Sequence, residues 1–228
     1  MIGELAALGA AISWAIAPIL YRRALNNTKA VSANIVRCVT NAGVLVAVLV
    51  LLGDVGVLAA LPGWVIALTV ISGVIGLGVG DTLYLYGLKH VGVSRAVPLA
   101  ATYPLFSILW PVALLGHTFS FVALLGALTI LVGIWLLSSQ KTEVNVKGQA
   151  TWLGVAACLA TAVVWSVSVT LMDMAVTYSG VTTLDANYAI ITLRIGAMAL
   201  FLLALAPLID RDHGFLKLSR KTIVLLCI

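Results

Sequence analysis

Two ionisable side chains lie deep inside apolar segments of this sequence. Asp81 comes eight residues before Lys89, about 12 Å from the end of its segment if that segment is helical. Arg194 lies ten residues into a later apolar segment, deeper than any other basic residue. Ionisable groups inside a membrane span are costly, and they usually face a cavity or a partner. Asp81 is therefore a candidate for proton coupling or for binding a cationic group, and a structural hydrogen bond between helices is the alternative.

Two arginines offer positive charge to the same region. Arg194 could attract a carboxylate or phosphate, or it could neutralise Asp81, and the sequence leaves these roles open. Arg37 lies only two turns from its loop, so we expect it to extend its side chain to the membrane surface.

Aromatic side chains supply the other candidates. Trp14 and Trp165 are central in their segments, whereas tyrosines could place hydroxyls in a cavity while their rings pack. Packing alone is the alternative for each. Tyr84 follows Asp81 by three residues and could donate to its carboxylate. The candidate substrate-binding residues are Trp14, Tyr21, Arg37, Asn41, Asp81, Tyr84, Tyr103, Trp165 and Arg194.

The composition places these residues in a membrane. Of 228 residues, 62% are hydrophobic and 9% charged, whereas a soluble domain carries about 25% charged residues. We predict an all-α polytopic membrane protein, because about 20 apolar residues cross the bilayer as a helix. The apolar runs long enough to span are 3–25, 31–53, 63–88, 94–116, 119–139, 151–177 and 184–209.

Two of these runs have features of a cavity wall. Ser72, Gly76 and Gly80 recur every four residues in the third run, and small residues at that spacing let helices approach closely. Pro98, Pro104 and Pro111 interrupt the fourth run, and such breaks survive in a membrane only beside protein or a water-lined cavity.

The charged loops predict an orientation. Lys and Arg follow the first, third, fifth and seventh runs and are absent after the second, fourth and sixth. The positive-inside rule then makes the odd-numbered connections cytoplasmic and the N-terminus external. The net charge of +5 is explained in this way, so we expect no nucleic-acid partner.

The sequence also repeats itself with five helices per unit. Trp14 aligns with Trp165, and the run around Arg37 resembles the run around Arg194. An odd number of spans inverts the second unit, an arrangement common in secondary transporters. We expect a first unit at 1–140, a linker at 141–150 and the start of a second unit at 151–228. The last apolar run is too short to span, so we expect a longer protein.

These residues are similar to a known family. The paired tryptophans and arginines, the stretch YLYGLKHVGVSRAVPLAATYPLFSILWPVALLGHTFS and the Gly126 to Gly133 spacing resemble EamA-type transporters of the drug/metabolite transporter superfamily. The resemblance covers one unit and about half of the second. It implies ten helices in two inverted five-helix units that move amino acids, metabolites, nucleotide sugars or drugs. It also implies cytoplasmic termini, whereas the loop charges predict an external N-terminus. We expect the orientation that the loop charges predict.

We therefore expect a multi-pass protein of the cell membrane that transports or exports small metabolites by alternating access. A membrane scaffold subunit without transport and an intramembrane enzyme are the alternatives, although GxSxG, HExxH and paired acids are absent from the sequence. Without a GxxxxGK[ST] loop, coupling to a proton or another ion, or plain facilitation, is left. The expected partners are a small-molecule substrate and the lipid bilayer. A homodimer stays open, and we expect no cofactor and no metal, because the histidines have no acidic companions at ligand spacing.

Overall fold

The computed structural model describes residues 2–116, 121–139, 150–177 and 183–227. Over these ranges the chain forms helices joined by short turns, without a strand. Five of the described helices are long and apolar enough to cross a membrane: Gly3–Asn27, Ala30–Leu52, Gly63–Val91, Trp152–Thr177 and Asp185–Ile209. The chain is an all-α polytopic membrane protein, as its composition predicts.

The first two expected spans form helices close to their predicted bounds. These are α1 (Ile2–Ala24) and α2 (Ala30–Leu52), and a short helix, α3 (Val55–Ala60), follows them. The C-cap of α2 is Gly53, whose φ of 78° is left-handed. Glycine adopts this conformation without strain, so it ends the helix cleanly.

The third expected span is a continuous helical segment with an irregular centre. It consists of α4 (Gly63–Gly73), a π-helix η2 (Val74–Gly80) and α5 (Asp81–Val91). Regular α-helical geometry through Asp81 is the sequence-based expectation, and it is wrong, because hydropathy carries no signal for a π-helix. Such segments are rare and occur frequently at functional sites.

A buried asparagine of α2 supports the π-helix. Asn34 donates from Nδ2 to the Leu77 carbonyl at 2.7 Å and to Thr82 Oγ1 at 2.9 Å. Thr82 Oγ1 donates in turn to the Gly78 carbonyl at 2.6 Å. These contacts satisfy backbone oxygens that would otherwise lack partners in an apolar surrounding.

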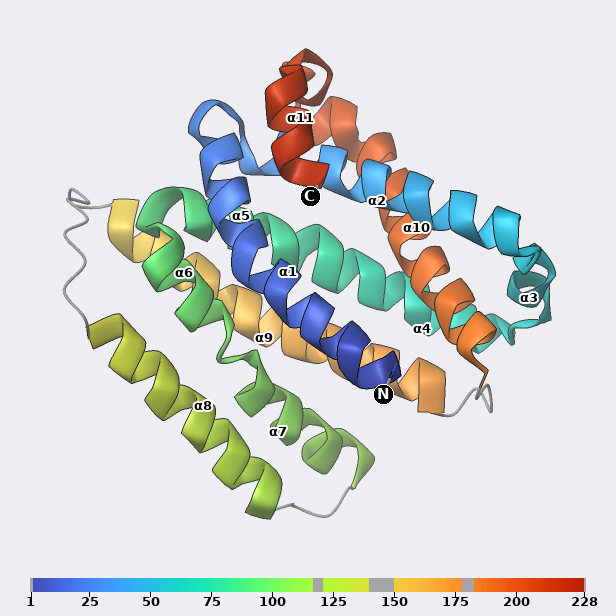
Figure 1. The fold of residues 1–228 in the computed structure, drawn as a ribbon, viewed down its shortest axis with the longest axis horizontal. Helices are drawn as coiled ribbons and strands as arrows, with labels where there is room; N and C mark the ends of the chain where they lie inside the picture. Colours follow the sequence, from blue (N-terminus) through green and yellow to red (C-terminus); the bar gives the residue numbers. More distant parts are fainter. Residues whose placement is uncertain (1, 117–120, 140–149, 178–182, 228) are drawn as a thin grey trace.

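The fourth expected span is broken, as its prolines predict. It comprises α6 (Val93–Ala100) and α7 (Tyr103–Leu115), which are separated at residues 101–102. Thr102 Oγ1 donates to the Leu99 carbonyl at 2.7 Å at the break. Pro104 falls in the first turn of α7, where its missing N–H is tolerated. The next helix, α8 (Phe121–Ser139), lies against α6 and α7 (Figure 1).

Two long helices complete the bundle, α9 (Ala150–Thr177) and α10 (Leu184–Ile209). A 3-10 turn η3 (Gly214–Lys217) and α11 (Arg220–Cys227) follow them. Figure 1 shows α9 running beneath α1 and α5, and α10 beside α2. Helix α9 contacts α4, α5, α6 and α7, so it is the central element of the bundle.

Helices α2 and α10 run antiparallel. Ser32, at the start of α2, donates to Asp210, just beyond the end of α10, at 2.9 Å. Tyr188, near the start of α10, donates to the carbonyl of Leu45, late in α2, at 3.1 Å. The second helix of the expected first unit and its counterpart in the second therefore cross in opposite directions, as an inverted repeat requires.

Helix α9 is antiparallel to the segment α4–α5. Ser168 donates to the Ser72 carbonyl at 2.6 Å, and Thr161 donates to the Gly80 carbonyl at 3.3 Å. Figure 1 shows α1 and α9 also running in opposite directions. The unit bounds at 140 and 151 stay a prediction, since only Ala150 of the expected linker lies among the described residues.

Several basic loops share one face of the bundle. Lys29, after α1, forms an ion pair with Asp212, after α10. Their hydrogen bond and mutual attraction raise the pKa of Lys29 and lower the pKa of Asp212. Lys89, near the end of α5, donates to the Thr28 carbonyl at 2.8 Å. The loops after the first, third and seventh expected spans thus lie together, and the membrane side they face stays a prediction.

Candidate functional site

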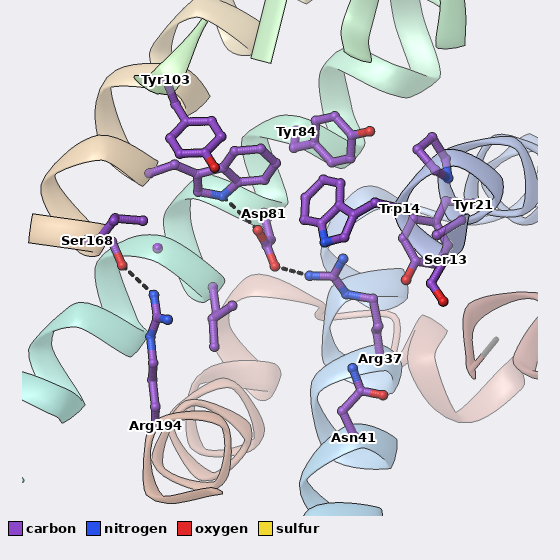
Figure 2. Close-up of a pocket in the computed structure, with 16 residues that line it drawn as sticks. Ser13, Trp14, Tyr21, Arg37, Asn41, Asp81, Tyr84, Tyr103, Ser168 and Arg194 are labelled. Carbon is purple, nitrogen blue, oxygen red and sulfur yellow. Dashed lines mark hydrogen bonds and ion pairs between the residues drawn. The ribbon is translucent and has the colours of Figure 1, made fainter. Parts of the chain in front are cut away.

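A cavity of about 380 Å³ opens between helices of both expected units. Its volume falls within the range of small-molecule sites. The lining side chains come from α1, α2, η2, α5, α7, α9 and α10 (Figure 2). They are Ser13, Trp14, Ala17, Pro18, Tyr21, Arg37, Asn41, Gly76, Leu77, Asp81, Tyr84, Tyr103, Trp165, Ser168, Val169 and Arg194.

All nine candidate residues line this cavity. They are Trp14, Tyr21, Arg37, Asn41, Asp81, Tyr84, Tyr103, Trp165 and Arg194. Their position together is a structural finding, whereas substrate binding by them stays a prediction. The sequence-based set lacks Ser168. The signal that could have found it is a hydroxyl in the middle of an apolar helix, which can form a hydrogen bond to another helix.

Arg37 and Asp81 form an ion pair within the cavity. Both side chains are nearly buried, with exposed fractions of 13% and 7%. The expectation that Arg37 extends to the membrane surface is therefore wrong. Helix α2 packs on α5, so the guanidinium meets a carboxylate at its own depth and has no need to reach water.

The second oxygen of Asp81 has a different partner. Trp165 of α9 donates from Nε1 to Asp81 Oδ1 at 2.8 Å. The expected donation from Tyr84 is wrong, because its hydroxyl is buried and has no hydrogen-bond partner among the described residues. The Tyr84 ring packs instead against Trp165, with centroids 5.2 Å apart. Asp81 thus joins α2, α5 and α9 through its two oxygens.

Trp165 is also the centre of an aromatic cluster. The ring of Trp14 meets it edge-on at 5.7 Å, and the ring of Tyr103 does so at 6.1 Å. Aromatic pairs prefer this geometry over face-to-face stacking. On the opposite side of the ion pair, the Arg37 guanidinium lies 5.4 Å from the ring centre of Tyr21. The cavity therefore combines an apolar aromatic wall with charged groups.

Arg194 occupies another part of the cavity and is not the ion-pair partner of Asp81. Its Nη2 donates to Ser168 Oγ at 2.7 Å (Figure 2). Its Nε is buried and has no hydrogen-bond partner among the described residues. The sequence leaves open whether Arg194 attracts a carboxylate or phosphate or neutralises Asp81. In the structure the ion-pair partner of Asp81 is Arg37.

Close packing by small residues brings α9 to the acid. The predicted contact stripe of Ser72, Gly76 and Gly80 faces α9, as the Ser168 to Ser72 hydrogen bond shows. A Cβ added at Gly80 would lie 2.7 Å from Cδ1 of Trp165. Only glycine leaves room for the indole at this point, so the stripe sets the position of the Trp165 donor.

The described residues contain no group of three or more His, Cys, Asp or Glu side chains that could hold a metal ion. The chemistry of the cavity is therefore that of its arginines, its aspartate, its hydroxyls and its aromatic rings. Such a site can recognise charge and shape.

The fold and the site define an integral membrane protein with a charged, solute-sized cavity among its helices. A model of the EamA-like transporter family matches residues 1–139. The chain belongs to this family, as the sequence resemblance predicts, and thereby to the drug/metabolite transporter superfamily.

One curated relative bears a matching description. An "Uncharacterized transporter" of Archaeoglobus fulgidus is 32% identical over 147 residues, which is 64% of this chain and 52% of the relative. The chain thus spans about half the length of this relative. No solved structure shows significant similarity to the chain.

Proposed function

We propose that this protein is a secondary transporter of small metabolites, such as amino acids or related solutes, in the cell membrane. Alternating access between two inverted units would move the solute. The observation that carries the proposal is the Asp81 carboxylate, held at the cavity by Arg37 of α2 and Trp165 of α9.

The position of this carboxylate suits a transport site. Asp81 lies ten residues before the end of α5 at Val91, about 15 Å along the helix and so about half of a 30 Å hydrocarbon layer. Transporters with inverted repeats bind substrate near the midplane, where the repeats meet. A charged pair at that depth carries a free-energy cost, and such residues commonly mark a substrate or ion pathway.

The two contacts of Asp81 also suit a change of access. Arg37 belongs to the expected first unit and Trp165 to the second, so the carboxylate bridges the units. Movement of one unit against the other would have to lengthen the bond to Trp165, because Asp81 itself and Arg37 both belong to the first unit. A proton or a cationic solute group on Asp81 would weaken both contacts and favour that movement.

Two other functions remain as alternatives. A scaffold subunit would need the same packing but no solute. An intramembrane enzyme would need a nucleophile held by a base, whereas Ser168 of the cavity lining donates to the Ser72 carbonyl and accepts from Arg194. Transport is the function that uses both the cavity and its charges.

Flux into proteoliposomes tests the proposal. We expect labelled amino acids or related solutes to enter liposomes containing the protein faster than empty liposomes. Asp81→Asn should abolish or uncouple this flux. Asp185→Asn, an exposed acid in the first turn of α10 outside the cavity, should leave it unchanged and is the matched control.

Asp81→Asn also leaves Arg37 without its partner, so folding is measured in parallel. In the double variant Asp81→Asn/Arg37→Gln neither charge is left unpaired. We expect this double variant to fold and to remain inactive. Normal flux in a folded double variant would contradict a role for Asp81, and absence of any flux in the unmodified protein would favour a scaffold.

A further inference from the structure

Arg194 is the one charged side chain among the described cavity residues without a charged hydrogen-bond partner. We propose that it binds the carboxylate of a substrate that carries one net negative charge. This inference rests on the proposed transport function and narrows its solutes. A zwitterionic amino acid is neutral overall, so the related solutes that carry a carboxylate alone are the class we infer.

The charges that line the cavity do not cancel. Its described lining contains three charged side chains, namely Arg37, Asp81 and Arg194. The first two neutralise each other in their ion pair. One positive charge is left, on a part-buried guanidinium, and a charge removed from water without compensation is costly. A solute with a single negative charge would make the site neutral.

The hydrogen bonds of Arg194 lead to the same conclusion. A guanidinium carries five N–H donors. Nη2 contacts a neutral hydroxyl, that of Ser168, and the Nε hydrogen has no acceptor among the described residues. Ser168 donates its hydroxyl hydrogen to the Ser72 carbonyl, so toward Arg194 it acts only as an acceptor. An acceptor with two oxygens, such as a carboxylate, could take the Nε hydrogen together with a second guanidinium hydrogen.

The surroundings hold the guanidinium in place for this task. A Cβ at Gly73 would lie 3.2 Å from Cγ of Arg194, and one at Gly76 would lie 3.1 Å from its Nη2. The two glycines thus let the end of α4 and the π-helix pack directly against the arginine stem and head. Arginine on a carboxylate commonly forms two parallel hydrogen bonds, and a side chain fixed beforehand loses less freedom on binding.

A carboxylate fits this charge better than a phosphate group. A phosphate monoester carries about 1.5 to 2 negative charges at pH 7, and Arg194 supplies one positive charge. The aromatic wall of Trp14, Tyr103 and Trp165 offers a surface for an apolar body. The inferred substrate class is therefore a small monocarboxylate with an apolar or aromatic body.

A pair of probes that differ in charge and little in shape tests the inference. The purified chain in detergent is titrated with 3-phenylpropanoate and with 3-phenylpropanamide, and binding is followed by tryptophan fluorescence and by the shift in unfolding temperature. We expect the carboxylate to bind at least about tenfold more tightly, as expected for hydrogen bonds to a charged group. Phenyl phosphate, the third probe, should bind more weakly than the carboxylate.

Variants assign the preference to Arg194. Arg194→Gln should bring the two affinities within about twofold of each other, chiefly by weakening the binding of the carboxylate. Arg194→Lys keeps the positive charge but loses the planar guanidinium that donates two parallel hydrogen bonds. It should retain part of the preference for the carboxylate. Arg95→Gln, at an exposed arginine of α6 outside the cavity, is the matched control and should retain all of it.

Three results would overturn the inference: a carboxylate that binds no better than its amide in the unmodified protein, a preference that survives in Arg194→Gln, or tighter binding of phenyl phosphate. The first and third need no variant, so a folding defect in Arg194→Gln leaves the inference open to refutation. Flux of neutral solutes without a carboxylate preference would keep transport and remove this site. A carboxylate preference without flux of any solute would keep the site and remove transport.

Discussion

Arg37 and Asp81, 44 positions apart in the sequence, form an ion pair between α2 and α5. The pair is nearly buried, so each charge depends on the other to stay in the apolar interior. Removing one partner of a buried pair is far more damaging than removing both, because a single removal leaves an uncompensated charge.

A double-mutant cycle should reveal this dependence. We expect Asp81→Asn and Arg37→Gln each to lower the free energy of unfolding by about 3–5 kcal/mol. The double variant should lose clearly less than the sum of the two single variants, because the residues are in contact. Denaturant unfolding of the detergent-solubilised protein measures all four forms. Strictly additive losses would contradict the pairing.

Tyr84 provides a contrast to the indole donor. Its buried hydroxyl has no hydrogen-bond partner among the described residues, so Tyr84→Phe should leave stability unchanged or raise it by about 1 kcal/mol. Trp165→Phe removes the donor to Asp81 and should cost at least about 1.5 kcal/mol. Thermal unfolding of both variants measures these two changes in stability. A loss above about 1 kcal/mol in Tyr84→Phe would mean that its hydroxyl does bind a partner.

The sequence predicts the membrane spans well because a span depends on local composition. The bounds of α1, α2, α9 and α10 fall within a few residues of the expected runs. The break near residue 101 is likewise a local effect of proline. The nine candidate residues also lie together. Polar side chains at mid-membrane depth are unfavourable against lipid, so they face the interior of the bundle or a cavity.

Which charge meets which is not a local property. The partner of Asp81 depends on how α2 is rotated against α5, and neither hydropathy nor distance from the nearest loop contains that rotation. Sequence alone therefore places Arg37 at the membrane surface and gives Tyr84 a hydrogen bond that is absent among the described residues. The π-helix before Asp81 is a further feature that hydropathy does not signal.

Gly80 should not tolerate replacement even by alanine, which adds a single methyl group. A Cβ there would lie 2.7 Å from the Trp165 ring, so Gly80→Ala must displace the indole from its place beside Asp81. We expect a loss of about 1–3 kcal/mol in unfolding free energy, as overpacking typically costs, and impaired flux. Gly43→Ala in α2, where a Cβ would meet nothing within 4 Å, is the control and should be neutral or slightly stabilising. Equal stability of both variants would argue against the close contact.

The shared basic face gives a test of orientation. Cys227 is exposed, whereas Cys38 and Cys158 are buried, so single cysteines are introduced into a Cys227→Ser background. If the loop charges decide orientation, a cysteine at Lys217 is shielded from an impermeant thiol reagent in intact cells. A cysteine at Asp54, between α2 and α3, is labelled. The reverse pattern would support the cytoplasmic termini implied by the family resemblance.

The π-helix makes chain length itself a determinant of the site. A π turn closes its hydrogen bond one residue later than an α turn, so Val74–Gly80 sets the phase between the two α-helical halves on either side of it. One further residue there, wound as α-helix, would rotate everything that follows by about 100°. Asp81 would then turn away from Arg37 and Trp165, although no cavity residue had been replaced and the hydropathy had hardly changed. In this stretch, insertions should be tolerated less well than substitutions.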